Sequence, residues 1–260
     1  MRLGLIGGTG LVQFDAHERL DEVGAELQRD DVLLVETPFG EVPLRCVSFL
    51  FKKKQCEIIF LQRHHGKTEH GCPPHAINHR ANVHALAQSN VEAILSVCSV
   101  GAIHKSFPPG KVALASQYID FTGVTTTFHH EDAVFTSVTA PFDESMNGTL
   151  EDALRKTQNF GTDERLRYTY WLTQGPQFET AAEIHAIELL GGDMVGMTMP
   201  REAKLSREVG IPYSALCISS NWAAGRDPSD EHRDLDHLLV SAQANQRLEP
   251  VWASIFSLFD

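Results

Sequence analysis

Short apolar runs recur along the chain, and most end at glycine or at a polar cluster, as buried strands do. Stretches with helical spacing follow several of them. The predicted strands are Leu3–Ile6, Val32–Val35, Glu41–Phe51, Cys56–Leu61, Ala93–Val100, Lys111–Phe121, Tyr168–Thr173, Met194–Val195 and Tyr213–Ser219. The predicted helices are Ala76–Ser89, Thr180–Leu190, Arg201–Val209 and a long closing helix, Leu235–Leu258.

Strands that alternate with helices predict an α/β fold with a central, mostly buried sheet. We find no repeat and no linker long enough to separate domains, so we expect one domain over residues 1–260. Ligands in such folds gather where the strands end. The loops at these ends contain Thr9, Arg63-His64, Cys98-Ser99, Gln174–Glu179, Met197-Thr198 and Asn221.

The net charge narrows the classes of binding partner, and the cysteine content indicates the cellular compartment. The net charge is −12, from 22 Lys and Arg against 34 Asp and Glu. Such a surface repels a nucleic-acid backbone, although a small anion can still bind in a locally positive pocket. No apolar run reaches the ~20 residues of a membrane span, and the first residues lack the pattern of a signal peptide. Five scattered cysteines, an odd number, make a reduced cytoplasm the simplest setting.

Two segments have the chemistry to hold an anion. The backbone N–H groups of Ile6–Gly10 and the hydroxyl of Thr9 can donate to phosphate, although a plain tight turn explains the glycines equally well. Arg63, at a strand end, offers a planar fork that suits phosphate. The histidines from His64 to His75 raise a metal hypothesis, but their irregular spacing and the lack of an HExxH sequence or a Cys/His quartet favour phosphate.

Three further segments suit a planar heterocycle and its sugar. In Gln174–Thr180, a Gly-Pro turn presents Phe178 and then Glu179, although Glu179 also suits the start of a helix. Met197 and Thr198 follow a strand and alternatively serve as core filler and helix cap. The amide of Asn221 can bridge two ring atoms of a purine, or simply turn the chain.

Sequence motifs for covalent catalysis are not found. The chain has no Gly-x-Ser-x-Gly sequence, and none of its cysteines lies in a motif that marks a nucleophile. The chemistry indicated is electrostatic placement of a bound anion, without a covalent protein intermediate.

In this order the motifs resemble the trimeric purine nucleoside phosphorylases, and most of all their methylthioadenosine and methylthioinosine branch. They are Ile-Gly-Gly-Thr-Gly, Thr-Pro-Phe-Gly (37–40), Arg-His, Pro-Pro-His-x-x-Asn-x-Arg-Ala-Asn (73–82), Gly-Pro-x-Phe-Glu-Thr and Gly-Met-Thr. The resemblance runs from Leu3 to the final helix. It implies one α/β domain with a mixed, partly barrel-like sheet flanked by helices, and a homotrimer. It also implies phosphorolysis of a nucleoside to free base and ribose 1-phosphate, with inorganic phosphate as co-substrate and no other cofactor or metal.

The resemblance also implies roles for individual residues. Those for phosphate are Thr9, Arg63, His64, Cys98, Ser99 and Thr198. Those for the nucleoside are Phe178, Glu179, Met197, Asn221, Ala223 and Leu235. Asn221, which stabilises the departing purine near N7, and His64 are the catalytic candidates. Phe128–Phe135 is a candidate for lending a lid residue to a neighbouring subunit.

Substrate choice follows from Glu179 and Asn221. A carboxylate accepts from the protonated N1 of a 6-oxopurine, and an Asn amide serves its O6/N7 edge, whereas the adenine-specific branch typically has Asp at the Asn221 position. Leu235 stands where the inosine/guanosine branch has a histidine for the 5′-hydroxyl, which favours a methylthio group. We therefore expect 5′-methylthioinosine, inosine or guanosine as substrate, with methylthioadenosine as the alternative.

The chain also departs from the family pattern. Arg63-His64-His65-Gly66 has about two extra residues before the prolines by pairing of the motifs, which leaves open whether His64 or His65 takes the phosphate role. The usual Met-(Ser/Thr)-x-x-Pro-Glu is Met197-Thr198-Met199-Pro200-Arg201-Glu202. Cys98-Ser99 replaces a Thr-Ala pair, and bulky Trp222 lies beside Asn221. A catalytically weakened nucleoside-binding homologue and a metal-dependent hydrolase are the competing hypotheses.

Overall fold

A computed structural model describes residues 1–66, 71–235 and 248–260. Its strands are β1 (Arg2–Gly7), β2 (Glu26–Thr37), β3 (Gly40–Phe51), β4 (Lys54–Gln62), β5 (Ala93–Ala102), β6 (Val112–Asp120), β7 (Arg167–Leu172), β8 (Met194–Gly196) and β9 (Tyr213–Trp222). Its α-helices are α1 (Ala16–Glu22), α2 (His79–Gln88), α3 (Glu144–Thr157), α4 (Ala181–Leu189), α5 (Met199–Glu208) and α7 (Leu248–Ser257). A 3₁₀ turn, η1 (Pro74–Ala76), precedes α2.

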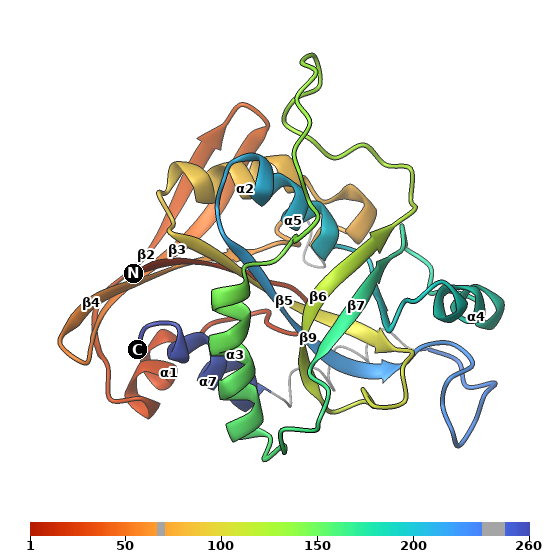
Figure 1. Ribbon diagram of the computed structural model, residues 1–260. Coiled ribbons are helices and arrows are strands. Elements are labelled where there is room, and N and C mark those ends of the chain that lie inside the picture. The colour runs from red at the N-terminus through yellow and green to blue at the C-terminus, as the bar shows by residue number, and fades with distance from the viewer. Residues whose placement is uncertain (67–70, 236–247) are drawn as a thin grey trace.

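All these strands form one mixed sheet in the order β2-β3-β4-β1-β5-β8-β7-β6-β9. β9 also pairs in parallel with β5, so the last five strands of this order close into a ring (Figure 1). β1 lies between β4 and β5 and is parallel to both. The expected α/β fold with a partly barrel-like sheet is therefore confirmed.

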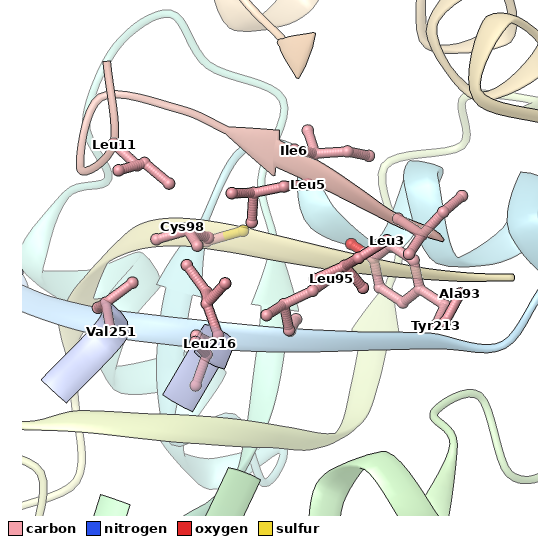
Figure 2. Packing of buried hydrophobic residues seen from close by; sticks show 14 of the residues in the cluster. Leu3, Leu5, Ile6, Leu11, Ala93, Leu95, Cys98, Tyr213, Leu216 and Val251 are labelled. Carbon is pink, nitrogen blue, oxygen red and sulfur yellow. The ribbon is translucent and has the colours of Figure 1, made fainter. Parts of the chain in front are cut away.

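The central strands are buried on both faces, which explains their almost continuous apolar sequences. Leu3, Leu5 and Leu95 are completely inaccessible to solvent, as is Leu216 of β9. Figure 2 shows these side chains of β1, β5 and β9 in one packed cluster, with Val251 of α7 beside them. The apolar runs of the sequence thus form a core that holds the strand ends in fixed positions.

Helices α2 and α5 pack against each other, and α3 packs against α7 (Figure 1). No helix in the described part of the chain is long and apolar enough to span a bilayer. The side chains of Asn78 and Thr180 cap the starts of α2 and α4, and Thr180 forms a reciprocal capping box with Glu183.

The structure corrects several predicted elements. Helices α1 and α3 were not predicted, although Asp15 and Asp143 cap them. The predicted helix Leu235–Leu258 is wrong at its start, because Leu235 is irregular and the described helix begins at Leu248; residues 236–247 lie outside the described residues. The helix predicted from Ala76 begins only at His79, because the extended backbone of Ile77 separates it from η1.

Candidate active site

Three neighbouring strands bring the predicted phosphate residues to one edge of the sheet. Gly7 of β1 pairs with Gln62 of β4, so the segment that contains Thr9 starts beside Arg63. A Cβ atom on Gly8 would lie only 2.1 Å from Nη1 of Arg63. Arg63 Nη1 also donates to the carbonyl of Val97 in β5 (2.9 Å), next to Cys98. Residues far apart in sequence therefore meet here, and a glycine at position 8 makes room for the guanidinium.

Arg63 is buried and forms an ion pair with Glu202, a residue absent from the set predicted from sequence. Arg63 Nε lies 2.6 Å from Glu202 Oε1, with the two side chains 2% and 1% exposed. Burial by itself raises the pKa of Glu202, but the attraction of Arg63 outweighs it, and the pKa lies below its usual value. The charge of Arg63 is thus already neutralised within the protein.

Further hydrogen bonds fix this ion pair. Ser96 Oγ and Tyr213 Oη donate to Glu202 Oε2 at 2.8 and 3.0 Å, and Arg63 Nη2 donates to Ser96 Oγ at 2.5 Å. Nη2 also donates to Glu202 Oε2 at 3.3 Å, so that with the contacts of Nε and Nη1 four of the five N–H groups of the guanidinium are occupied. The group that remains is on Nη1, the nitrogen that faces Gly8. Arg63 can therefore offer a ligand at most one N–H in this arrangement.

The side chains of Cys98 and Ser99 have different surroundings. Cys98 Sγ lies 3.6 Å from Arg63 Nη2, and burial raises the pKa of its thiol, so it is a neutral core group at pH 7. The hydroxyl of Ser99 is buried and has no hydrogen-bond partner among the described residues. A buried hydroxyl without a partner is costly, so Ser99 is the better candidate to contact a ligand.

The neighbouring histidines contact different parts of the chain. His64 Nδ1 lies 2.8 Å from the carbonyl oxygen of Cys72, and His65 Nε2 lies 2.7 Å from Asn82 Oδ1 on α2. His79, on the first turn of α2, was not singled out in the sequence analysis. Its Nδ1 is 4.0 Å from Glu202 Oε1, and burial lowers its pKa to about 4, so it is neutral at pH 7.

A metal centre receives no support from these histidines. Over residues 1–66, 71–235 and 248–260, no three His, Cys, Asp or Glu side chains are grouped closely enough to hold an ion. His70 lies outside the described residues.

Met197 and Thr198 lie between β8 and α5, opposite the loop that follows β7. Gly175 has φ +66°, and a Cβ atom on it would lie 2.6 Å from the sulfur of Met197. Thr198 is the N-cap residue of α5, but its side chain makes no capping hydrogen bond. Its hydroxyl therefore remains available for a ligand at the start of the helix.

Glu179 is held by the strand end next to Met197. Thr173 Oγ1 donates to Glu179 Oε1 (2.6 Å), while the backbone N–H of Thr173 donates to the carbonyl of Gly196 (2.9 Å). Burial raises the pKa of Glu179 above its usual value. Phe178, beside it, is half-buried. The carboxyl group is thus fixed through one oxygen, and Oε2 can serve a ligand.

Asn221 and Ala223 lie at the end of β9. Asn221 pairs with Gly101 of β5, and Ala223 packs with Ile184 of α4, so this strand end lies close to the helix that follows Glu179. The Asn221 amide donates to the carbonyl of Trp222 (2.7 Å) and accepts from Ser220 Oγ (3.0 Å). The amide is therefore turned toward its own strand and has to rotate to meet a base.

Leu235 is partly exposed, in irregular chain at the edge of the described residues. No described contact joins Leu235 to the other predicted residues, so its role at the 5′ end of the nucleoside stays a prediction. Phe128 contacts Phe39 and His84, with ring centroids 5.5 and 6.0 Å apart, whereas Phe135 is 94% exposed.

A cavity of about 620 Å³ lies away from the predicted residues, between α1, β3 and α7. Phe14, Arg45, Gln62 and Trp252 are among its lining residues. The cavity comes close to the predicted site only at Gln62, the residue before Arg63. Because no predicted site residue lines the cavity, the cavity is not the candidate active site.

Sequence reasoning missed four residues of this region: Glu202, Ser96, Tyr213 and His79. Ser96 and Tyr213 lie inside apolar runs, where nothing distinguishes them from core positions. The sequence does contain a signal for Glu202. This residue occupies the position of the final Glu in the Met-(Ser/Thr)-x-x-Pro-Glu pattern, although the proline is shifted.

Comparison with known proteins places the chain in a family. The sequence model of the phosphorylase superfamily matches residues 2–255. A protein of Thermodesulfovibrio yellowstonii named probable S-methyl-5′-thioinosine phosphorylase is 33% identical over 86% of this chain and 79% of its own. The 6-oxopurine nucleoside phosphorylase of Pyrococcus furiosus is 36% identical over 86% of this chain and 80% of its own.

Solved structures of phosphorylases have the same fold as this chain. A methylthioadenosine phosphorylase from an Antarctic soil metagenomic library is 27% identical, with a TM-score of 0.78 over 99% of this chain and 84% of that one. The methylthioadenosine phosphorylase of Schistosoma mansoni, solved with adenine, has the same fold, with a TM-score of 0.81 at 24% identity over 99% of this chain and 90% of that one. The chain therefore belongs to the phosphorylase superfamily.

Proposed function

We propose that this protein catalyses phosphorolysis of a 6-oxopurine nucleoside. The products are the free purine and ribose 1-phosphate, or 5-methylthioribose 1-phosphate when the substrate is 5′-methylthioinosine. The observation that carries the proposal is the presence of both Glu179, fixed by Thr173 after β7, and an Asn at position 221 at the end of β9. The curated relatives named above act on 6-oxopurine nucleosides or methylthioinosine by name, which agrees with this choice.

Glu179 and Asn221 recognise the purine in this mechanism. Glu179 accepts a hydrogen bond from N1–H of the base, while the amide of Asn221 rotates away from Trp222 and donates at O6 or N7. As the glycosidic bond breaks, negative charge builds on the purine, and the rotated amide of Asn221 stabilises it. Phe178 and Ala223 supply the apolar walls of the same pocket.

Phosphate lies beneath the sugar in the proposed complex. The hydroxyls of Thr9, Ser99 and Thr198 donate to its oxygens, and Met197 packs under the ribose. His64 already donates its Nδ1 hydrogen to the carbonyl of Cys72, so its Nε2 accepts from a protonated phosphate oxygen. Phosphate then stabilises the oxocarbenium-like sugar and attacks it, which needs placement and charge rather than a protein nucleophile. Cys98 supports this site as a neutral group, and Arg63 contributes through its remaining Nη1 hydrogen.

We further propose that residues 1–260 fold as one domain and assemble as a homotrimer, with inorganic phosphate and a nucleoside as small-molecule partners in the cytoplasm. The exposed ring of Phe135 and the segment around it supply the contact surface. Light scattering that reports a monomer contradicts the trimer.

A direct assay tests the proposed activity. Methylthioinosine, inosine, guanosine and methylthioadenosine are incubated separately with the protein, with and without phosphate, and the released base is measured. Phosphate-dependent release from the 6-oxopurine nucleosides supports the proposal. Release from methylthioadenosine alone favours the second candidate, methylthioadenosine phosphorylase, the activity that names the solved structures compared above.

A further inference from the structure

Arg201 is a buried cation without a counter-ion. Its side chain is 4% exposed, and its hydrogen bonds go to neutral acceptors, Gln174 Oε1 (2.6 Å) and the carbonyl of Met197 (3.4 Å). Its Nε has no hydrogen-bond partner among the described residues. Nor does any carboxylate in the described ranges lie within 4.0 Å of its guanidinium, although other arginines have such ion pairs.

The nearby carboxylates have other partners. Burial lowers the pKa of Arg201 and outweighs the attraction of Asp120. Glu202, the next residue, pairs with Arg63. Asp120 is bonded to Lys204 and to Thr122. A buried charge is tolerated when a charge of opposite sign meets it, so the surroundings of Arg201 indicate an anion that is supplied from outside the described chain.

The place of Arg201 in the fold indicates which anion that is. Arg201 lies on the first turn of α5. The N-cap residue of this helix is Thr198, whose hydroxyl makes no capping hydrogen bond. A helix N-terminus favours negative charge, but Pro200 has no N–H and leaves this one with fewer backbone donors than usual. Arg201 also replaces the proline of the family pattern. At this position Arg201 therefore offers five side-chain N–H donors, whereas a proline offers none.

We propose that Arg201 binds the phosphate co-substrate, together with Thr198 and Ser99, and carries the positive charge that Arg63 shares with Glu202. The inference rests on the proposed function in taking phosphate as the anion. Arg201 swings from Gln174 toward the bound phosphate, whose charge replaces the missing counter-ion. The family pattern places no cation at this position, so the contact distinguishes this chain.

Binding of inorganic phosphate to the nucleoside-free protein tests this role. Calorimetric titrations at fixed ionic strength compare the wild type with Arg201→Met, Arg201→Lys and the control Arg207→Met. Arg207 lies on the same helix but is exposed. The control therefore removes an equal charge from a solvent-exposed position. We expect Arg201→Met to weaken phosphate binding at least tenfold, Arg201→Lys to weaken it less, and Arg207→Met to leave it within twofold.

Two further measurements separate this role from a structural one. The KM for phosphate should rise in Arg201→Met while the Kd for hypoxanthine stays unchanged. Without phosphate, Arg201→Met should be at least as heat-stable as the wild type, because the substitution removes an unpaired buried charge. Phosphate binding by Arg201→Met with the wild-type Kd overturns the inference.

The outcomes also separate the inference from the proposed function. If the wild type binds phosphate and Arg201→Met does not, Arg201 is a phosphate ligand even when no nucleoside is cleaved, and only the proposed function fails. If the wild type cleaves nucleosides and Arg201→Met binds phosphate normally, the function stands and the inference fails.

Discussion

Nε of Arg63, at the end of β4, lies 2.6 Å from Oε1 of Glu202 on α5, and neither side chain is more than 2% exposed. The two residues are 139 positions apart in sequence. Their ion pair joins the Gly8 side of the candidate phosphate site to the helix that begins after Thr198. The shape of the site therefore depends on a contact that binds no substrate itself.

We predict that Glu202→Gln lowers the free energy of unfolding by about 3–5 kcal/mol, because it leaves the buried guanidinium of Arg63 without its counter-charge. Urea denaturation measures the change. The control is Glu22→Gln, which breaks an exposed ion pair with Arg19 and should cost less than about 1 kcal/mol. Equal losses in both variants contradict the importance of the buried pair.

Gly8→Ala should damage both stability and activity. The added methyl group would meet Nη1 of Arg63. The guanidinium has little freedom to move, because Nη1 is bonded to Val97, Nη2 to Ser96 and Nε to Glu202. Overpacking of this kind costs about 1–3 kcal/mol. Gly148→Ala, inside α3 with open space where the added Cβ atom would lie, should instead stabilise the protein by roughly 0.5–1 kcal/mol. Thermal melts and phosphate KM values of the two variants decide the matter; a harmless Gly8→Ala contradicts the crowded geometry.

The pH dependence of stability should report the burial of Glu179. Its pKa is raised, so the folded state favours the protonated form, and stability is lost as pH rises through the folded pKa. Glu179→Gln should therefore be more stable than the wild type at pH 7, with the difference vanishing below the usual range of carboxyl pKa values. Activity on 6-oxopurine nucleosides should nevertheless fall.

Glu183→Gln supplies the control of opposite sign. Hydrogen bonds from the backbone and side chain of Thr180 lower the pKa of Glu183, so its stabilisation is present at neutral pH and is lost as pH falls through the folded pKa. This variant should be less stable than the wild type at pH 7 and converge with it in acid. If both variants shift stability in the same direction at pH 7, the assigned surroundings of Glu179 are wrong.

Asn221→Asp should move substrate preference toward 6-aminopurines. A carboxylate accepts from the 6-amino group but repels the O6 edge of hypoxanthine. The ratio of kcat/KM for methylthioinosine over methylthioadenosine should fall by about 100-fold or more. An unchanged ratio means that Asn221 does not contact the base.

The sequence predicted the core of the fold well where burial dominates. Each of β1, β4, β5 and β9 contains a short, mostly apolar run, and such a run has few alternatives to a central strand. It failed where local signals were weak. In α3, Gly148 interrupts a mostly polar helix, and its cap Asp143 lies in a long irregular stretch. In β2, only Val32–Val35 was recognised, because most of its side chains are exposed and charged residues fill its first half.

The site was predicted as a set of strand ends, and the sheet does bring Gly8, Arg63 and Cys98 together. What sequence could not supply was the partner of each polar group. The pairing of Arg63 with Glu202 and the isolation of Arg201 both depend on how α5 packs against the strand ends and α2. Linear sequence does not contain that relation.

The most direct test of the account is the initial rate of hypoxanthine release from 5′-methylthioinosine, measured with and without inorganic phosphate. We predict release that requires phosphate and yields 5-methylthioribose 1-phosphate in equal amount. Release at the same rate without phosphate, or none from methylthioinosine, inosine or guanosine, would contradict it.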